Sequence, residues 1–220
     1  RVARVPGIRS AHVVGHSMGC IVAQHLAVID PGLVRSLVLF GPLLALPEAA
    51  RPLIRARGEQ ARSEGTAGMQ AIADTLLQTA VSTRTRRERR AAWAFVRESL
   101  LRQPPAGYAA NCEALAGSQP ADVARLGCPV LLVTGDEDRV APPEAVRALA
   151  AALDARTAAR VVVLSGCGHW HPIEQPEEGL RLCLDHLQRA ERLARESARR
   201  LALAADRAAG RGSGHPAVVR

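Results

Sequence analysis

The 220-residue chain contains no lysine, so all 29 residues counted as Lys or Arg are arginine. Only 2% of the residues are aromatic, too few for the stacking surfaces with which proteins hold single-stranded nucleic acids. The formal net charge is nevertheless +8. Because this arginine excess accompanies abundant alanine, it is typical of a GC-rich coding sequence. We therefore predict no nucleic-acid partner.

The chain also lacks paired cysteines and long apolar runs. Its five cysteines are odd in number and dispersed, and no Cys-x-x-Cys occurs. This pattern favours reduced thiols in a cytoplasmic protein over a disulfide framework. No stretch approaches the length of a membrane-spanning helix, so we predict no membrane partner. No His, Cys and Asp cluster has metal-ligand spacing, and we predict no metal and no cofactor.

What the chain does contain is the pentapeptide Gly15-His16-Ser17-Met18-Gly19. The Gly-x-Ser-x-Gly spacing is typical of a nucleophile elbow, in which a serine occupies a tight turn between a strand and a helix. The flanks agree, because residues 10–14 are typical of a short buried strand and residues 20–27 of a helix start. We expect both glycines to be needed because side chains there would clash.

A serine needs a base to take its proton and a carboxylate to orient that base. Two later apolar runs, 129–134 and 159–164, are typical of buried strands. The first is followed by a loop with Asp136, Glu137 and Asp138, and the second by a loop with His169 and His171. Catalytic side chains are expected at the carboxyl ends of parallel strands, where both loops lie.

These motifs resemble the catalytic triad of the α/β-hydrolase superfamily, from about residue 8 to about residue 187. The matching segments are GHSMG, GDED and GCGHWHPIEQP. In that family the acid falls three residues after the glycine, which selects Asp138, and the histidine turn selects His169, with His171 as the alternative base. Glu174-Gln175-Pro176 fills the Glu-x-Pro position. The resemblance implies Ser17 as nucleophile, the Met18 amide as oxyanion donor and no cofactor.

The expected fold is α/β, a partial α/β-hydrolase fold with a parallel sheet flanked by helices and a helical cap insertion. Strands are predicted near 10–15, 36–40, 129–134 and 159–164. The predicted core comprises residues 1–42 and 122–187, with residues 43–121 as the cap. Residues 1–7 are interpreted as the end of a helix and a loop. Residues 188–220 are interpreted as an Ala/Arg-rich helical extension that becomes disordered from Gly210.

Four side chains are candidates to line the substrate site: His16, Trp93, Tyr108 and Trp170. For Trp93 and Tyr108 we favour the alternative that they form the core of the cap. The stretch 104–116, followed by the strand near 128–132, is similar to that of 3-oxoadipate enol-lactonases. This likeness implies a small ester or lactone as substrate. A cofactor-free haloperoxidase-like esterase would carry the same triad.

The family normally has several strands before the elbow, whereas this chain begins almost at it. We therefore expect a fragment or a truncated relative, in which the strand near 10–15 exposes an edge. The second oxyanion donor normally comes from a loop after one of those earlier strands. The alternative to an enzyme is consequently a non-catalytic relative that keeps the fold as a binding module. The sequence does not indicate an oligomeric state.

Overall fold

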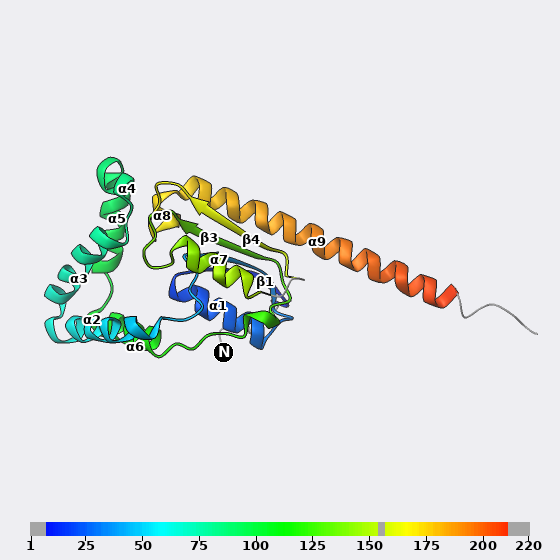
Figure 1. The fold of residues 1–220 in the computed structure, drawn as a ribbon, viewed down its shortest axis with the longest axis horizontal. Coiled ribbons are helices and arrows are strands. Elements are labelled where there is room, and N and C mark those ends of the chain that lie inside the picture. The colour runs from blue at the N-terminus through cyan, green and yellow to red at the C-terminus, as the bar shows by residue number, and fades with distance from the viewer. Residues whose placement is uncertain (1–7, 154–156, 211–220) are drawn as a thin grey trace, which may run out of the picture.

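The computed structural model describes residues 8–153 and 157–210, with side chains to residue 206. The predictions for residues 1–7 and 211–220 lie outside the described residues. Four parallel strands form one sheet in the order β1-β2-β3-β4 (Figure 1). The predicted strands are confirmed with small shifts in their bounds: β1 (Ala11–His16), β2 (Val34–Phe40), β3 (Val130–Gly135) and β4 (Ala159–Leu164).

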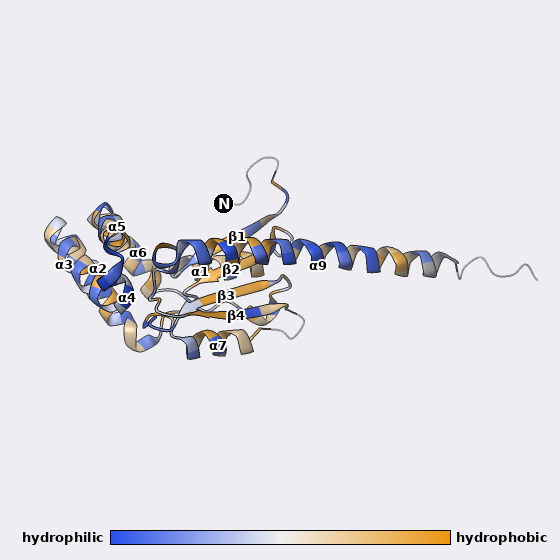
Figure 2. Ribbon diagram, turned by 90° about the horizontal axis from the view of Figure 1, so that it is seen from above, coloured by the Kyte–Doolittle hydropathy of each residue, from blue (hydrophilic) through white to orange (hydrophobic). Residues whose placement is uncertain are grey.

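Helices cover both faces of this sheet, which explains why the central strands are apolar without alternation. Leu37, Leu39 and Leu132 face α1 (Met18–Ile29) and α7 (Pro143–Ala151) in one core cluster. Val38 and Val133 point to the other face, toward α9 (Pro176–Gly210). Figure 2 shows β3 and its neighbours as the most hydrophobic elements. The predicted fold class, an α/β sheet flanked by helices, is confirmed.

Between β2 and β3 the chain forms helices that stand apart from the sheet at one of its ends (Figure 1). After the short η1 (Glu48–Ala50) come the five helices that we call the cap helices. They pack on one another around small apolar clusters that include Met69, Leu77 and Val96. The predicted boundary of the cap at 43–121 remains a proposal. The cap helices are α2 (Arg51–Glu64), α3 (Thr66–Thr79), α4 (Thr83–Glu88), α5 (Arg90–Leu101) and α6 (Pro105–Ala116).

The chain returns to the sheet through η2 (Val123–Arg125), and after β4 it forms the short α8 (His171–Glu174) and then α9. The first part of α9 packs on the sheet through Leu182, which is buried. Its last turns extend beyond the sheet (Figure 1), and Leu201 is 72% exposed there. This helix runs through the segment interpreted as a helical extension and reaches Gly210. None of the described helices is long and apolar enough to cross a membrane.

β1 lies at an edge of the sheet. Within the described residues it pairs with β2 alone, in parallel register from Ala11 opposite Val34 to His16 opposite Phe40. Val14, near the middle of this strand, is 57% exposed. Within residues 8–153 and 157–210, the strand that leads into Ser17 is therefore paired on one side, as is β4, whereas β2 and β3 are paired on both.

Candidate active site

Ser17 occupies the turn between β1 and α1. Its φ is 53°, and among the described residues no other residue except glycine has a positive φ. Its backbone N–H donates to the Phe40 carbonyl at 2.9 Å, which extends the β1–β2 ladder into the turn. This conformation costs an L-residue free energy and is commonly found at functional sites. Met18 begins α1, so its N–H belongs to the first turn, whose donors have no partner within the helix.

The two glycines of the elbow differ. A Cβ atom on Gly15 would lie 2.8 Å from the carbonyl oxygen of Gly19, so a side chain there would clash, as predicted. A Cβ atom on Gly19 would meet nothing within 4 Å in the part of the chain that the structure describes. The predicted clash at Gly19 is therefore wrong, because no described segment packs over that position.

Asp138 lies in the loop after β3 and is 2% exposed. Its Oδ1 accepts hydrogen bonds from the backbone N–H groups of Val140 (2.8 Å) and Ala141 (2.9 Å). Its Oδ2 accepts one from Nδ1–H of His169 at 2.9 Å. Burial alone would raise the pKa of this carboxyl, but the hydrogen bonds from His169 and the backbone, together with the nearby His171 ring, outweigh it and hold the pKa well below its usual range. Asp138 is therefore an ionised, fixed acceptor.

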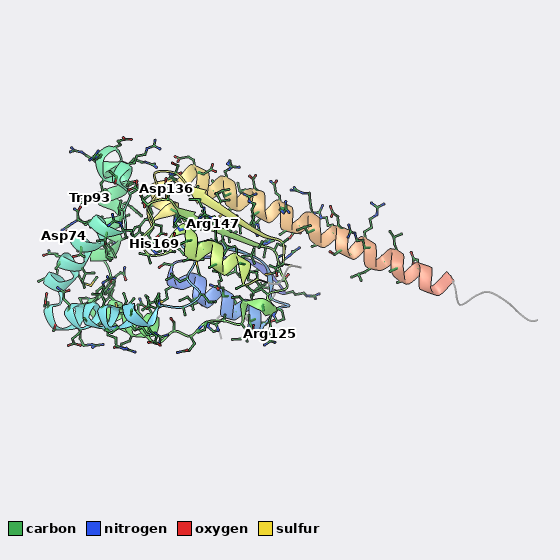
Figure 3. The ribbon with its side chains drawn as sticks, viewed as in Figure 1. Asp74, Trp93, Arg125, Asp136, Arg147 and His169 are labelled. Carbon is green, nitrogen blue, oxygen red and sulfur yellow. The ribbon has the colours of Figure 1, made fainter. Side chains whose placement is uncertain are left out.

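His169 lies in the loop after β4, on the side of the core that faces the cap helices (Figure 3). It is 6% exposed, and its backbone N–H donates to the Ala80 carbonyl at 2.8 Å. While Nδ1 is engaged by Asp138, Nε2 is buried and has no hydrogen-bond partner within the described residues. The ring packs closely on Gly41, where a Cβ atom would come within 2.7 Å of Cε1. One nitrogen is thus oriented and the other is free to accept a proton.

The competing residues of the two loops have other partners. Asp136 accepts a hydrogen bond from the backbone N–H of Cys167, and Glu137 accepts two from Thr83. His171 is fully buried with Nε2 3.3 Å from Asp138 Oδ2, so both imidazoles lie against the same carboxylate oxygen. Burial lowers the pKa of His171 and keeps its ring neutral.

His16 joins the nucleophile turn to the base loop. Its Nε2–H donates to the backbone carbonyl of His169 at 2.7 Å, and its ring centroid lies 5.0 Å from that of His169. Burial, followed by the neighbouring His169, lowers the pKa of His16 to about 4, so the ring is neutral near pH 7. The sequence indicated this residue for the substrate site and gave no signal for its bond to the base loop.

The other candidate substrate residues lie in different surroundings. Trp170 is next to the site, with its ring 5.6 Å from that of His16 and its indole N–H buried without a partner within the described residues. Trp93 packs in the cap cluster that contains Leu77 and Val96 (Figure 3), and Tyr108 joins three cap clusters. The last two positions match the predicted cap-core alternative, and a substrate-binding role for all four residues remains a prediction.

Sequence reasoning missed Gly41 as part of the site, and it named Glu174 in the Glu-x-Pro position without assigning it a role. Gly41 has φ at 58°, and the Gly-Pro pair that ends β2 was its available signal. Glu174 accepts three backbone hydrogen bonds around His169, described below. Within residues 8–153 and 157–210, no group of three or more His, Cys, Asp or Glu side chains is placed to hold a metal ion.

The chain resembles known proteins in its sequence and in its fold. Residues 2–181 match the model of the Alpha/beta hydrolase family. A thermophilic esterase from Thermogutta terrifontis has a similar structure, with a TM-score of 0.75 and 26% identity over 82% of this chain and 65% of the esterase. The enol-lactonase from Burkholderia xenovorans LB400 gives a TM-score of 0.72 and 27% identity over 82% of this chain and 66% of the lactonase.

A shorter likeness links 70 residues of the chain, at 39% identity, to the "Probable lysophospholipase BODYGUARD 2" of Arabidopsis thaliana. The match spans 31% of this chain and 15% of the plant protein. The chain thus spans somewhat less than two thirds of the two solved structures and a small part of the plant protein.

Proposed function

The chain belongs to the alpha/beta hydrolase family, and on that basis we propose that it cleaves a carboxylic ester or lactone with Ser17 as nucleophile, His169 as base and Asp138 as acid. The observation that carries the proposal is the state of the His169 ring. Nδ1 is bound to an ionised, buried Asp138, and Nε2 is buried without a partner within the described residues. An imidazole that a carboxylate orients at one nitrogen, and whose other nitrogen is unpaired, supports the role of general base.

In the first half of the reaction, Nε2 of His169 takes the proton from the Ser17 hydroxyl as the oxygen attacks the acyl carbon. Asp138 holds the proton on Nδ1 and stabilises the imidazolium that forms. The carbonyl oxygen becomes an oxyanion and accepts a hydrogen bond from the Met18 N–H at the start of α1. Collapse of this intermediate breaks the C–O bond, and His169 returns its proton to the leaving alkoxide.

In the second half, a water molecule gives a proton to Nε2 of His169 and attacks the acyl-enzyme. The carboxylic acid leaves, and Ser17 recovers its proton. With a lactone, both product groups stay on one molecule, because the leaving alkoxide and the acyl carbon belong to the same ring. The sequence likeness to 3-oxoadipate enol-lactonases supports an enol-lactone of this kind as substrate.

The proposal includes a cytoplasmic location. All five cysteines lie in the described residues and none forms a disulfide. Burial raises the pKa of the Cys128 thiol to about 11, so this thiol is protonated and weakly reactive at neutral pH.

Turnover tests the proposal. We expect purified wild-type chain to hydrolyse p-nitrophenyl acetate and at least one small enol-lactone, and we expect Ser17→Ala to lose this activity. Faster turnover of the lactone would support a lactonase, and turnover of esters alone would favour the haloperoxidase-like esterase. A folded wild-type chain that hydrolyses neither, at a rate above that of Ser17→Ala, would contradict the proposal and favour the non-catalytic binding module.

A further inference from the structure

Glu174, the last residue of α8, is a buried carboxylate that the proposed chemistry does not use. It is 1% exposed. Both of its oxygens accept hydrogen bonds from backbone N–H groups: Oε2 from Ser82 at 2.9 Å, and Oε1 from Gly168 and Trp170 at 3.1 Å each. A charge removed from water is tolerated only when hydrogen bonds replace its solvation, and here the backbone supplies them.

The three donors come from two segments that are far apart in the sequence. Gly168 and Trp170 flank His169 in the loop after β4. Ser82 lies between α3 and α4, in a segment that we call the cap connection (residues 80–83). The N–H of His169 itself donates to Ala80 of that connection at 2.8 Å. Each backbone N–H group from residue 168 to residue 170 therefore donates a hydrogen bond to Glu174 or to the cap connection.

The two segments also touch backbone to backbone. A Cβ atom on Gly168 would lie 2.6 Å from the Ala80 carbonyl oxygen and 2.7 Å from the Ser82 nitrogen, so only glycine fits. A second carboxylate holds the same connection from the acid loop, because Glu137 accepts hydrogen bonds from the N–H and hydroxyl of Thr83 at 2.8 and 2.7 Å. The cap connection is thus bonded to both loops of the proposed acid and base.

We propose that Glu174 is a positioning residue for His169. It acts through the backbone of residues 168–170 and ties the placement of the imidazole to the cap connection. That this placement of His169 matters for catalysis rests on the proposed function. A displacement of a catalytic group by about 1 Å can lower a rate about 100-fold, so a carboxylate that fixes this loop controls the reaction without touching the substrate.

The direct test is Glu174→Gln. The glutamine amide turns an N–H group toward backbone N–H groups, so at least one of the three donors loses its acceptor. With circular dichroism and thermal unfolding confirming a folded chain, we expect labelling of Ser17 by a fluorophosphonate to slow about 10- to 100-fold. For p-nitrophenyl acetate we expect kcat to fall with KM unchanged. The matched control is Glu177→Gln, an exposed carboxylate three residues away, which we expect to match wild type.

Two readouts do not depend on activity. We expect Glu174→Gln to weaken or lose the downfield proton signal of the His169 Nδ1–H hydrogen bond, and to speed hydrogen exchange at the amides of Gly168, His169 and Trp170. A folded Glu174→Gln chain that keeps the labelling rate, the signal and the exchange rates of wild type would overturn the positioning role.

If wild type itself is not labelled, the proposed function fails, and the imidazole signal and amide exchange still decide the role of Glu174. If Glu174→Gln does not fold, Glu174→Asp replaces it, keeping the charge on a side chain one methylene shorter. We then expect a smaller loss of labelling and of the imidazole signal, and unchanged values for both would overturn the role.

Discussion

The proposed base and nucleophile are held in different ways. The loop of His169 follows β4, which within the described residues pairs with β3 alone, but the loop is bonded to Asp138, Glu174, His16 and the cap connection. Ser17 follows β1, which pairs on one side alone within the described residues and exposes Val14. The comparison indicates that one turn sets the position of the nucleophile. The position of the base depends on hydrogen bonds to segments that are far from it in the sequence.

The largest expected effect is on the base side. Asp138→Asn replaces the ionised acceptor of His169 with an amide, which favours the wrong imidazole tautomer while preserving shape. By analogy with serine hydrolases that have the same constellation, kcat should fall about 10⁴-fold. Steady-state hydrolysis of p-nitrophenyl acetate measures it, with Asp136→Asn as control because Asp136 contacts the Cys167 amide instead. An equal loss in both variants would contradict the assignment of the acid.

The second prediction compares apolar side chains of the two regions. Leu132 in β3 is fully buried, and Leu132→Ala should lower the free energy of unfolding by about 2–5 kcal/mol. Val14 in β1 is 57% exposed, and Val14→Ala should change it by less than about 0.5 kcal/mol. Urea unfolding of both variants measures the difference. A large loss at Val14 would mean that another surface covers β1 in solution.

A third prediction uses two glycines. A Cβ atom on Gly135 would lie 2.0 Å from the Cys167 carbonyl oxygen, so Gly135→Ala must move the acid or base loop and should lower stability by about 1–3 kcal/mol or more. Gly19→Ala meets no described atom and lies in a helix, so it should change stability by less than about 1 kcal/mol. Thermal unfolding of both variants measures the difference. Equal destabilisation of the two would contradict the difference in packing around Gly135 and Gly19.

The last prediction concerns the pH dependence of stability. Burial lowers the pKa of His16 and of His186 to about 4, against an ordinary value of 6.5. Between pH 6.5 and 4 the unfolded chain binds more protons than the folded chain, so stability falls as pH falls, and this contribution levels off below about 4. Urea midpoints at pH 7.5 and 5 measure the fall, and His186→Gln should reduce it. A pH-independent midpoint in wild type would contradict the burial of these rings.

Much of the fold was predictable because its signals are local. Short apolar runs predicted all four strands, and the elbow spacing predicted a strained Ser17. The sequence could not reveal that Glu174 accepts a hydrogen bond from Ser82, 92 residues away. Nor could it reveal that His16 donates one to the carbonyl of His169, 153 residues away. Such contacts depend on how the loops meet in space, and any buried polar side chain can supply them. The choice of Asp138 over Asp136 came from family resemblance.

The central claim is that His169, in the loop after β4, activates Ser17, in the turn after β1. The most direct measurement is mass spectrometry of the intact chain and of its peptides after treatment with a fluorophosphonate at neutral pH. The account predicts one adduct per chain, located on Ser17, which disappears in Ser17→Ala and forms far more slowly in His169→Gln. A folded wild-type chain that forms no adduct, or labels equally in His169→Gln, would contradict it.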